Sequence, residues 1–301
     1  MGNAVAAIDC GTNSIRLLIT ENGRDLEREM HVVRLGAGVD RTGRLDPAAI
    51  ERTRVALAEY VELIARHGVD RVRMVATSAT RDSANAADFH EMVRTTLGHP
   101  AEVISGDEEA ALSFRGAVDG LPDGGERLVI DIGGGSTEFV RGGREVGAAI
   151  SMDIGSVRMT ERHLHSDPPT AAELAAATAD IDAAVTRALA VVGAEPATLV
   201  GVAGTVTTVA GIALELDSYR PELTHHTVVP LAAVEEIAER LAGLDHAGRA
   251  AIRAIHPGRV DVITAGTLIL RQIMRRTGSA ELVVSEHDIL DGIATSLIEP
   301  K

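Results

Sequence analysis

The sequence predicts an α/β protein with two similar domains, and three observations support this fold class. Extended and helical segments alternate along the chain, which is typical of layered α/β architectures. A length of 301 residues suits two domains better than one. A glycine-containing segment at residues 9–14 recurs at residues 131–136. A repeat at this distance predicts that each domain carries one copy of the segment.

In the first half of the chain, short apolar runs alternate with amphipathic stretches. Leu57, Val61 and Ile64 recur at helical spacing, and Gly68 follows at a position suited to end that helix. A run of three acids marks the start of a later helix, which ends near Val118. We expect strands over residues 4–9, 15–20, 29–35, 71–76 and 101–104, and helices over 47–66, 84–97 and from the acids to about 118.

The segment 119–125 is rich in Gly, Pro and Asp and is the candidate boundary between the domains. Further on, Pro168 and Pro169 break the chain before a long helix that Thr170 is placed to cap. Beyond the boundary we expect strands on both sides of the second glycine segment and over 144–151, 198–203 and 281–284, an extended stretch over 224–230, and helices over 155–163, 171–192, 204–216, 231–241, 247–255, 260–276 and 288–297.

The two repeated segments share the pattern D-x-G-x-x-S between apolar runs. Glycine tolerates positive φ and lets a ligand approach the backbone closely, and consecutive N–H groups in such a turn form an anion-binding concavity. The alternative is a pair of glycine-rich hairpins that only turn the chain. The repetition favours two phosphate loops that serve one shared cleft, and their candidate binding residues are Gly11, Thr12, Asn13, Ser14, Gly133, Gly134, Gly135 and Ser136.

The second loop is also a candidate metal site. Carboxylates flank it, at Asp131 and Glu138. A carboxylate beside bound phosphate needs a divalent cation to offset the like charge. The stretch 129–138 therefore predicts a site for phosphate together with a metal.

A third anion-binding candidate follows a predicted strand that ends near Ala203. Gly204 and Thr205 stand there at the start of a helix, where N–H groups point at an anion. The P-loop pattern with its lysine is absent from the sequence, which counts against a P-loop nucleotide hydrolase.

The acids Asp107, Glu108 and Glu109 have two interpretations. Carboxylates at a helix start are favoured by the helix dipole, by about 0.3–1 kcal/mol each. One of them is alternatively placed to orient an attacking water. The residues alone do not choose among the three.

The arginines near these loops are also open to two interpretations. Arg158 and Arg162 share a helix face and either line a path for a polyanion or are solvated surface residues. Arg16, in the strand that leaves the first loop, either meets phosphate or lies on the surface. His163 and His165 have no convincing metal partners, and we assign them no role.

Composition restricts the class of partner and the compartment. A net charge of −15 argues against broad binding to nucleic acid or anionic membranes, although a local arginine-lined cleft can still hold a polyanion. The single cysteine, Cys10, excludes an intramolecular disulfide and suits a reducing compartment. Ile132 stands at the equivalent position of the second loop, so we expect Cys10 to be a small apolar residue that fills space. The first residues lack the pattern of a signal peptide. We expect a cytoplasmic protein.

Taken together, these segments resemble the exopolyphosphatase/guanosine pentaphosphate phosphohydrolase family. The resemblance covers nearly the whole chain and rests on several ordered motifs, which are far more specific than one glycine loop. The motifs are Asp9-Cys-Gly-Thr-Asn-Ser14, Ala76-Thr-Ser-Ala-Thr-Arg81, Ile104-Ser-Gly-Asp-Glu-Glu-Ala110, Asp131-Ile-Gly-Gly-Gly-Ser-Thr-Glu138, Ala203-Gly-Thr205 and Pro257-Gly-Arg-Val-Asp261.

The resemblance implies the fold of the actin, heat-shock chaperone and sugar-kinase superfamily, with two ribonuclease-H-like domains around a central cleft. The domains would be residues 1–123 with the returning C-terminal helix at 288–301, and residues 124–287. Long family members carry a further helical domain, and this chain resembles the short two-domain form.

The resemblance also implies residue roles. The second glutamate of the acidic motif, Glu109, would be the general base that positions water for in-line attack on a terminal phosphorus. Arg81 would contact phosphate with a guanidinium suited to two parallel hydrogen bonds. Asp131 and Glu138 would hold Mg²⁺ or Mn²⁺, directly or through water. The implied assembly is a homodimer.

Three classes of function follow from this. The first is an Mg²⁺-dependent hydrolase of inorganic polyphosphate, or of guanosine pentaphosphate. The second is an ATP-dependent kinase of the same superfamily, which the acidic motif disfavours. The third is a nucleotide sensor or actin-like assembly protein that binds phosphate without turnover, because one fold hosts many functions.

Overall fold

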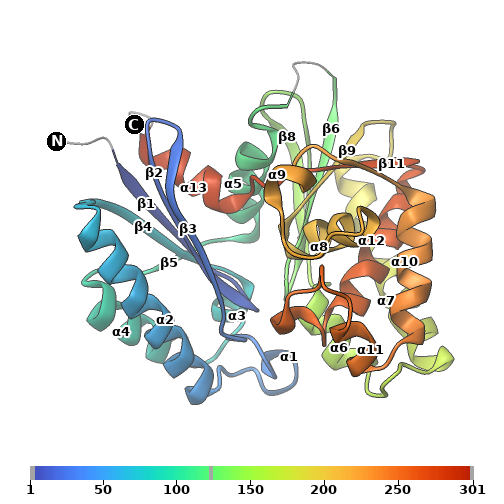
Figure 1. Cartoon of the computed structure of the whole chain (residues 1–301), viewed down its shortest axis with the longest axis horizontal. Helices are drawn as coiled ribbons and strands as arrows, with labels where there is room; N and C mark the ends of the chain where they lie inside the picture. The colour runs from blue at the N-terminus through green and yellow to red at the C-terminus, as the bar shows by residue number, and fades with distance from the viewer. Residues whose placement is uncertain (1–3, 122–124, 299–301) are drawn as a thin grey trace. The chain divides into compact units, whose positions relative to one another are not determined.

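The structure is a computed structural model that describes residues 4–121 and 125–298. The chain forms two compact units (Figure 1): unit 1 is Met1–Gly116 with Ile289–Lys301, and unit 2 is Ala117–Asp288. The sequence places the first boundary between residues 123 and 124, which lies outside the described residues. The described chain divides after Gly116 instead. The cleft that the sequence predicts between the domains stays a prediction.

Unit 1 contains a sheet in the order β3-β2-β1-β4-β5. Strand β2 is antiparallel to both of its neighbours, whereas β1, β4 and β5 run parallel. All six residues of β1 are buried, as expected for a central strand covered on both faces. The strands are β1 (Val5–Cys10), β2 (Ser14–Glu21), β3 (Arg24–Val32), β4 (Arg71–Ala76) and β5 (Glu102–Val103).

Two pairs of helices cover the two faces of this sheet (Figure 1). Helices α2 (Pro47–Arg66) and α4 (Ala86–Leu97) bury Leu57, Tyr60 and Phe89 against one face. On the other face, α5 (Gly106–Val118) and α13 (Ile289–Ile298) form a second apolar cluster with β1. The C-terminal helix therefore packs in unit 1, the arrangement that the family resemblance implies.

Unit 2 contains a sheet in the order β10-β11-β9-β6-β7-β8. Its strands β6, β9 and β11 are parallel, and β7 is antiparallel to its neighbours. The order β8-β7-β6-β9-β11 repeats that of unit 1, with β10 added at the edge, and confirms two similar ribonuclease-H-like domains. The strands are β6 (Arg127–Ile132), β7 (Thr137–Gly142), β8 (Val146–Met152), β9 (Thr198–Val202), β10 (Val228–Pro230) and β11 (Glu281–Val284).

The helices of unit 2 build its large apolar core, to which α7 contributes Ile181 and Val185 and α12 contributes Ile269. They are α6 (Ser156–His163), α7 (Ala171–Val192), α8 (Ala203–Ala213), α9 (Pro221–Thr224), α10 (Leu231–Gly243), α11 (His246–Ala250) and α12 (Ile263–Thr277), with a 3₁₀ turn at Pro257–Arg259. None of the helices in the described residues is long and apolar enough to cross a membrane.

Several predicted elements were wrong in extent. The third strand begins at Arg24 because Asn22 and Gly23 adopt φ of 51° and 78°, the values of a tight hairpin turn. The helix predicted over 247–255 is only α11, and within it the buried Arg249 donates to the carbonyl oxygens of Leu244 and Val260. Three short helices of the described chain were not predicted, α1 (Val39–Thr42), α3 (Ser78–Arg81) and α9 (Pro221–Thr224).

Candidate functional site

The first predicted phosphate loop connects β1 to β2 as a two-residue hairpin. The N–H of Gly11 donates to the carbonyl oxygen of Ser14 at 3.0 Å, which leaves residues 12 and 13 at the tip. The segment after β3 binds the tip from behind. Gly36 N–H donates to the Thr12 oxygen at 2.8 Å, and Arg34 N–H donates to the Asn13 oxygen at 2.8 Å. These bonds fix the carbonyl groups of the tip on one side.

The second predicted phosphate loop has the same geometry between β6 and β7. Gly133 N–H donates to the Ser136 oxygen at 3.0 Å, so Gly134 and Gly135 form the tip. Here the N-terminus of α6 holds the loop from behind, since Ser156 N–H donates to the Gly133 oxygen at 2.9 Å. The two predicted loops are therefore hairpins of the same geometry, one in each unit.

The strand positions beside the two loops differ in charge. In unit 1, Asp9 stands directly opposite Arg16, whose guanidinium donates to the Asp9 carboxylate at 2.7 and 3.1 Å. In unit 2, Asp131 stands directly opposite Glu138. Both of these carboxylates are more than nine-tenths buried. Like charges that face each other across a strand pair are unfavourable, so the unit 2 pair suits a cation.

The Asp131–Glu138 pair fits the coordination that Mg²⁺ prefers. The cation takes oxygen ligands and usually uses one or two carboxylates while keeping waters and substrate phosphate. Ser151 donates a hydroxyl hydrogen bond to Glu138 at 2.7 Å and orients that side chain. Groups of three or more His, Cys, Asp or Glu side chains that could hold a metal ion are absent from the described residues.

The third predicted loop lies at the same edge of the unit 2 sheet. Asp131 pairs in register with Val202, so the start of α8 is beside the second loop. A Cβ on Gly204 would lie 2.2 Å from the guanidinium carbon of Arg259, which shows that this arginine covers the glycine. Thr205 is buried. Arg259 therefore adds positive charge to a helix N-terminus already suited to anions.

In unit 1, two contacts connect the predicted residues. Thr12 Oγ1 lies 3.0 Å from the hydroxyl of Ser78, the first residue of α3, and Arg81 ends that helix. Arg81 Nη1 donates to the Ile104 oxygen at 2.9 Å and to Glu109 Oε2 at 3.2 Å. The first loop, the arginine and the predicted base thus form one network.

The three acids at the start of α5 have different surroundings. Asp107 is exposed. Glu108 forms an exposed ion pair with Arg73 at 2.7 Å, and its N–H is capped by the hydroxyl of Ser105. Glu109 is only 8% exposed, and its carboxylate lies beside the guanidinium of Arg81. Of the three acids, it is the one whose surroundings suit the predicted role of base. Its assignment as base stays a prediction.

The other residues that the sequence analysis singled out have different surroundings. Arg162 and His163 both bind Asp180, at 2.8 and 2.9 Å. Cys10 is buried, and burial together with the charge of Asp9 raises the pKa of its thiol. It remains a neutral apolar filler. Arg158 instead contacts Gly135 of the second loop.

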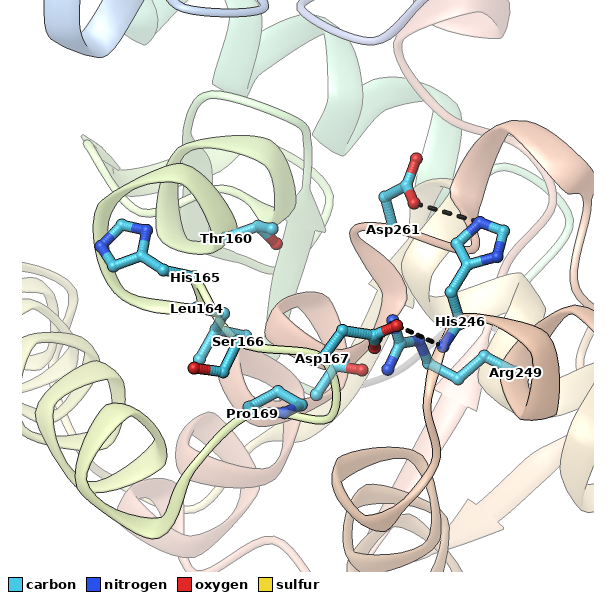
Figure 2. A pocket seen from close by; sticks show the side chains of 10 residues that line it. Thr160, Leu164, His165, Ser166, Asp167, Pro169, His246, Arg249 and Asp261 are labelled. Carbon is cyan, nitrogen blue, oxygen red and sulfur yellow. Dashed lines mark hydrogen bonds and ion pairs between the residues drawn. The ribbon is translucent and has the colours of Figure 1, made fainter.

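Beyond the C-terminal half of α6 lies a cavity of about 220 Å³ (Figure 2). Asp167 faces Arg249 there, at 2.8 Å, and His246 lies 3.3 Å from Asp261. The charged groups of this cavity pair with one another. It therefore offers no excess of positive charge for a phosphate, in contrast to the loops.

Sequence reasoning missed the contacts that hold the loops. It gave no role to Arg259, although the motif around it was noted, and it did not place Arg158 behind the second loop or Ser151 beside Glu138. Each acts across a long separation in the chain, and no local pattern marks such a contact.

Comparisons with known proteins agree with this geometry. Residues 19–299 match the Ppx/GppA phosphatase family. The chain is 50% identical to exopolyphosphatase 2 of Mycobacterium tuberculosis, over 97% of this chain and 98% of that protein. A crystal structure of an Aquifex aeolicus Ppx/GppA family member covers 97% of this chain and 96% of its own, with 32% identity and a TM-score of 0.81. A crystal structure of an exopolyphosphatase from Cytophaga hutchinsonii covers 98% of both chains, with 25% identity and a TM-score of 0.90. Because the family model spans most of the chain and a relative is 50% identical over nearly its whole length, the chain belongs to the Ppx/GppA phosphatase family.

Proposed function

We propose that this protein is an exopolyphosphatase that hydrolyses the terminal phosphate of inorganic polyphosphate with the help of Mg²⁺. The observation that carries the proposal is the buried carboxylate of Glu109 beside the guanidinium of Arg81, in a network with the first phosphate loop. The name of the Mycobacterium tuberculosis relative supports the choice of substrate.

The reaction needs positioning and charge neutralisation more than covalent chemistry. Glu109 accepts a proton from water while the water oxygen bonds to the terminal phosphorus. The bridging P–O bond breaks, and the shortened chain leaves with that electron pair. Arg81 and the N–H groups of the loops offset the negative charge on the phosphoryl oxygens.

Asp131 and Glu138 are the residues proposed to hold the cation. Mg²⁺, or Mn²⁺ in its place, would supply charge neutralisation at the phosphate oxygens. The hydroxyl of Ser151 donates to the Glu138 carboxylate and so restricts the orientation of that side chain. We also propose that the protein is a cytoplasmic homodimer. Size-exclusion chromatography with light scattering tests the dimeric state.

The experiment measures phosphate release by the purified protein with Mg²⁺, offered short polyphosphate, long polyphosphate, guanosine pentaphosphate and ATP in parallel. The Glu109→Gln variant is assayed beside it, and Glu108→Gln is the matched control because its carboxylate pairs with Arg73 on the surface. We expect release from polyphosphate to fall by about 10²–10⁴-fold in Glu109→Gln and to persist in Glu108→Gln.

Four results would overturn the proposal. Full activity of a folded Glu109→Gln protein would exclude this glutamate as the base. Release from guanosine pentaphosphate alone would move the substrate to the other branch of the family. Phosphorylation of a small acceptor by ATP, or binding without any release, would favour the kinase or the sensor respectively.

A further inference from the structure

The three carbonyl groups of the second phosphate loop are all held from the side of α6. Ser156 N–H donates to the Gly133 oxygen at 2.9 Å. The N–H groups of Val157 and Arg158 donate to the Gly134 oxygen at 2.8 and 3.1 Å. The Gly135 oxygen accepts from a side chain instead, the Nε–H of Arg158 at 2.7 Å.

These bonds determine where the N–H groups of the loop point. In a planar trans peptide the N–H points opposite to the C=O of the same unit. Because the carbonyl groups of residues 133–135 face α6, the N–H groups of residues 134–136 face away from it. Within the described chain, no acceptor is found for the N–H groups of Gly134 and Gly135. The loop therefore presents donors on the side opposite the helix.

Of the three peptide units, the last depends on one side chain. The N-terminal N–H groups of α6 bind the first two carbonyl groups, and among the described residues only Arg158 Nε is found to bind the third. Glycine at position 135 adds no steric barrier to rotation of that unit. A flip would present the Gly135 carbonyl oxygen, and not the Ser136 N–H, to a phosphate.

The first loop achieves the same orientation without a side chain. Its Asn13 oxygen accepts from two backbone N–H groups, those of Val33 at 3.1 Å and Arg34 at 2.8 Å. Within residues 4–121 and 125–298, the second loop has a backbone donor for the Gly133 and Gly134 carbonyl groups and none for that of Gly135. Arg158, whose side chain is 12% exposed, occupies the position of that missing donor.

We propose that Arg158 is a positioning residue for phosphate binding: it locks the Gly135–Ser136 peptide with its N–H toward the substrate. This inference rests on the proposed function, since it assigns the second loop to substrate phosphate. The guanidinium suits the task because it is permanently charged and its Nε–H points in a fixed direction. Arg158 acts through the loop and need not touch the substrate.

The test compares Arg158→Gln and Arg158→Lys with the matched control Arg162→Gln. Arg162 lies one turn further along the same helix and binds Asp180 at 2.8 Å, away from the loop. Each variant is assayed for kcat and KM on polyphosphate at saturating Mg²⁺, for tripolyphosphate affinity by calorimetry under conditions without turnover (Ca²⁺ in place of Mg²⁺), and for thermal unfolding.

In Arg158→Gln we expect KM and the tripolyphosphate Kd to rise by about tenfold or more, with a smaller change in kcat and an unfolding temperature close to that of the wild type. Arg158→Lys should recover part of the affinity, because its ammonium can still donate to the Gly135 oxygen. Arg162→Gln should match the wild type in KM and Kd.

The proposal is overturned if Arg158→Gln and Arg162→Gln have the same KM and Kd, or if the loss in Arg158→Gln follows its unfolded fraction. Calorimetry separates this outcome from failure of the proposed function. If the wild type releases no phosphate but binds tripolyphosphate more tightly than Arg158→Gln does, the proposed activity is contradicted. The proposed role of Arg158 in phosphate binding then still holds.

Discussion

Gly155 packs closely against the backbone of the second predicted phosphate loop. A Cβ on Gly155 would lie 2.3 Å from the carbonyl oxygen of Gly134, and 2.6 Å from the carbonyl carbon of Gly135. Its φ of −132° and ψ of 165° are extended values that any residue adopts. The requirement for glycine at this position is therefore one of space and not of backbone conformation.

We predict that Gly155→Ala weakens phosphate binding and destabilises the fold. Forcing a methyl group against fixed backbone costs about 1–3 kcal/mol and displaces the loop. The measurements are KM for polyphosphate and the midpoint of urea unfolding. Gly143→Ala is the control, because the nearest atom to its added Cβ is 4.0 Å away. Equal KM values in the two variants would contradict the close packing of Gly155.

The carboxylate pair of unit 2 leads to a prediction about metal. Glu138→Gln removes one charge opposite Asp131 while keeping the shape and the hydroxyl contact of Ser151. We expect the Mg²⁺ concentration for half-maximal activity to rise by at least about tenfold. A titration of phosphate release against Mg²⁺ measures this shift. The exposed Glu145→Gln variant serves as the control, and an unchanged Mg²⁺ requirement in Glu138→Gln would remove this residue from the metal site.

At the scale of one element, helix α7 shows how a capping motif couples stability to pH. Thr170 and Glu173 form a reciprocal capping box at its start, and Glu173 also accepts from the N–H groups of His165 and Ser166. The backbone hydrogen bond from Thr170 is the main cause that lowers the pKa of Glu173 to about 2. The ionised form is therefore the one that the folded protein binds.

A folded-state pKa below the unfolded value means that this stabilisation is complete above about pH 4.5. It is lost as pH falls from there toward about 2. We predict that Glu173→Gln has a shallower decline in the free energy of unfolding across this window than the wild type. Urea unfolding followed by far-UV circular dichroism between pH 6 and pH 2.5 measures it. Parallel curves for wild type and variant would contradict the role of Glu173.

At the scale of the molecule, the last helix completes the first unit. The chain leaves unit 1 after Gly116 and returns at Ile289. Leu290 and Ile293 of α13 then close the apolar cluster that includes Leu112 of α5. The helix that carries Glu109 is therefore supported by the final segment of the chain.

Gly292 is the contact point between these two helices. A Cβ there would lie 2.0 Å from the carbonyl oxygen of Leu112, so the helices touch through their backbones. We predict that Gly292→Ala lowers both the unfolding temperature and kcat, because it displaces α5 together with Glu109. Thr295→Ala on the same helix is the control. A variant with lowered stability and unchanged kcat would show that α13 does not position the base.

The loops and most helices are readable from the sequence because their causes are local. Glycine beside a buried apolar run specifies the hairpins, and apolar spacing specifies helices such as α2. The strand at Arg24 was misplaced because the Asn22-Gly23 turn signal was overlooked, and not because tertiary structure overrode it.

By itself, the sequence determined an α/β fold and two repeated glycine loops, and it predicted a short set of acids that includes the proposed base. Only the tertiary structure decided which acid is buried against Arg81, which arginine covers Gly204, and which side chain holds Gly135. The physical reason is the separation along the chain between the residues that interact. A turn or a helix depends on neighbours in the chain, whereas burial and hydrogen bonds between distant segments exist only after the sheets and helices have packed.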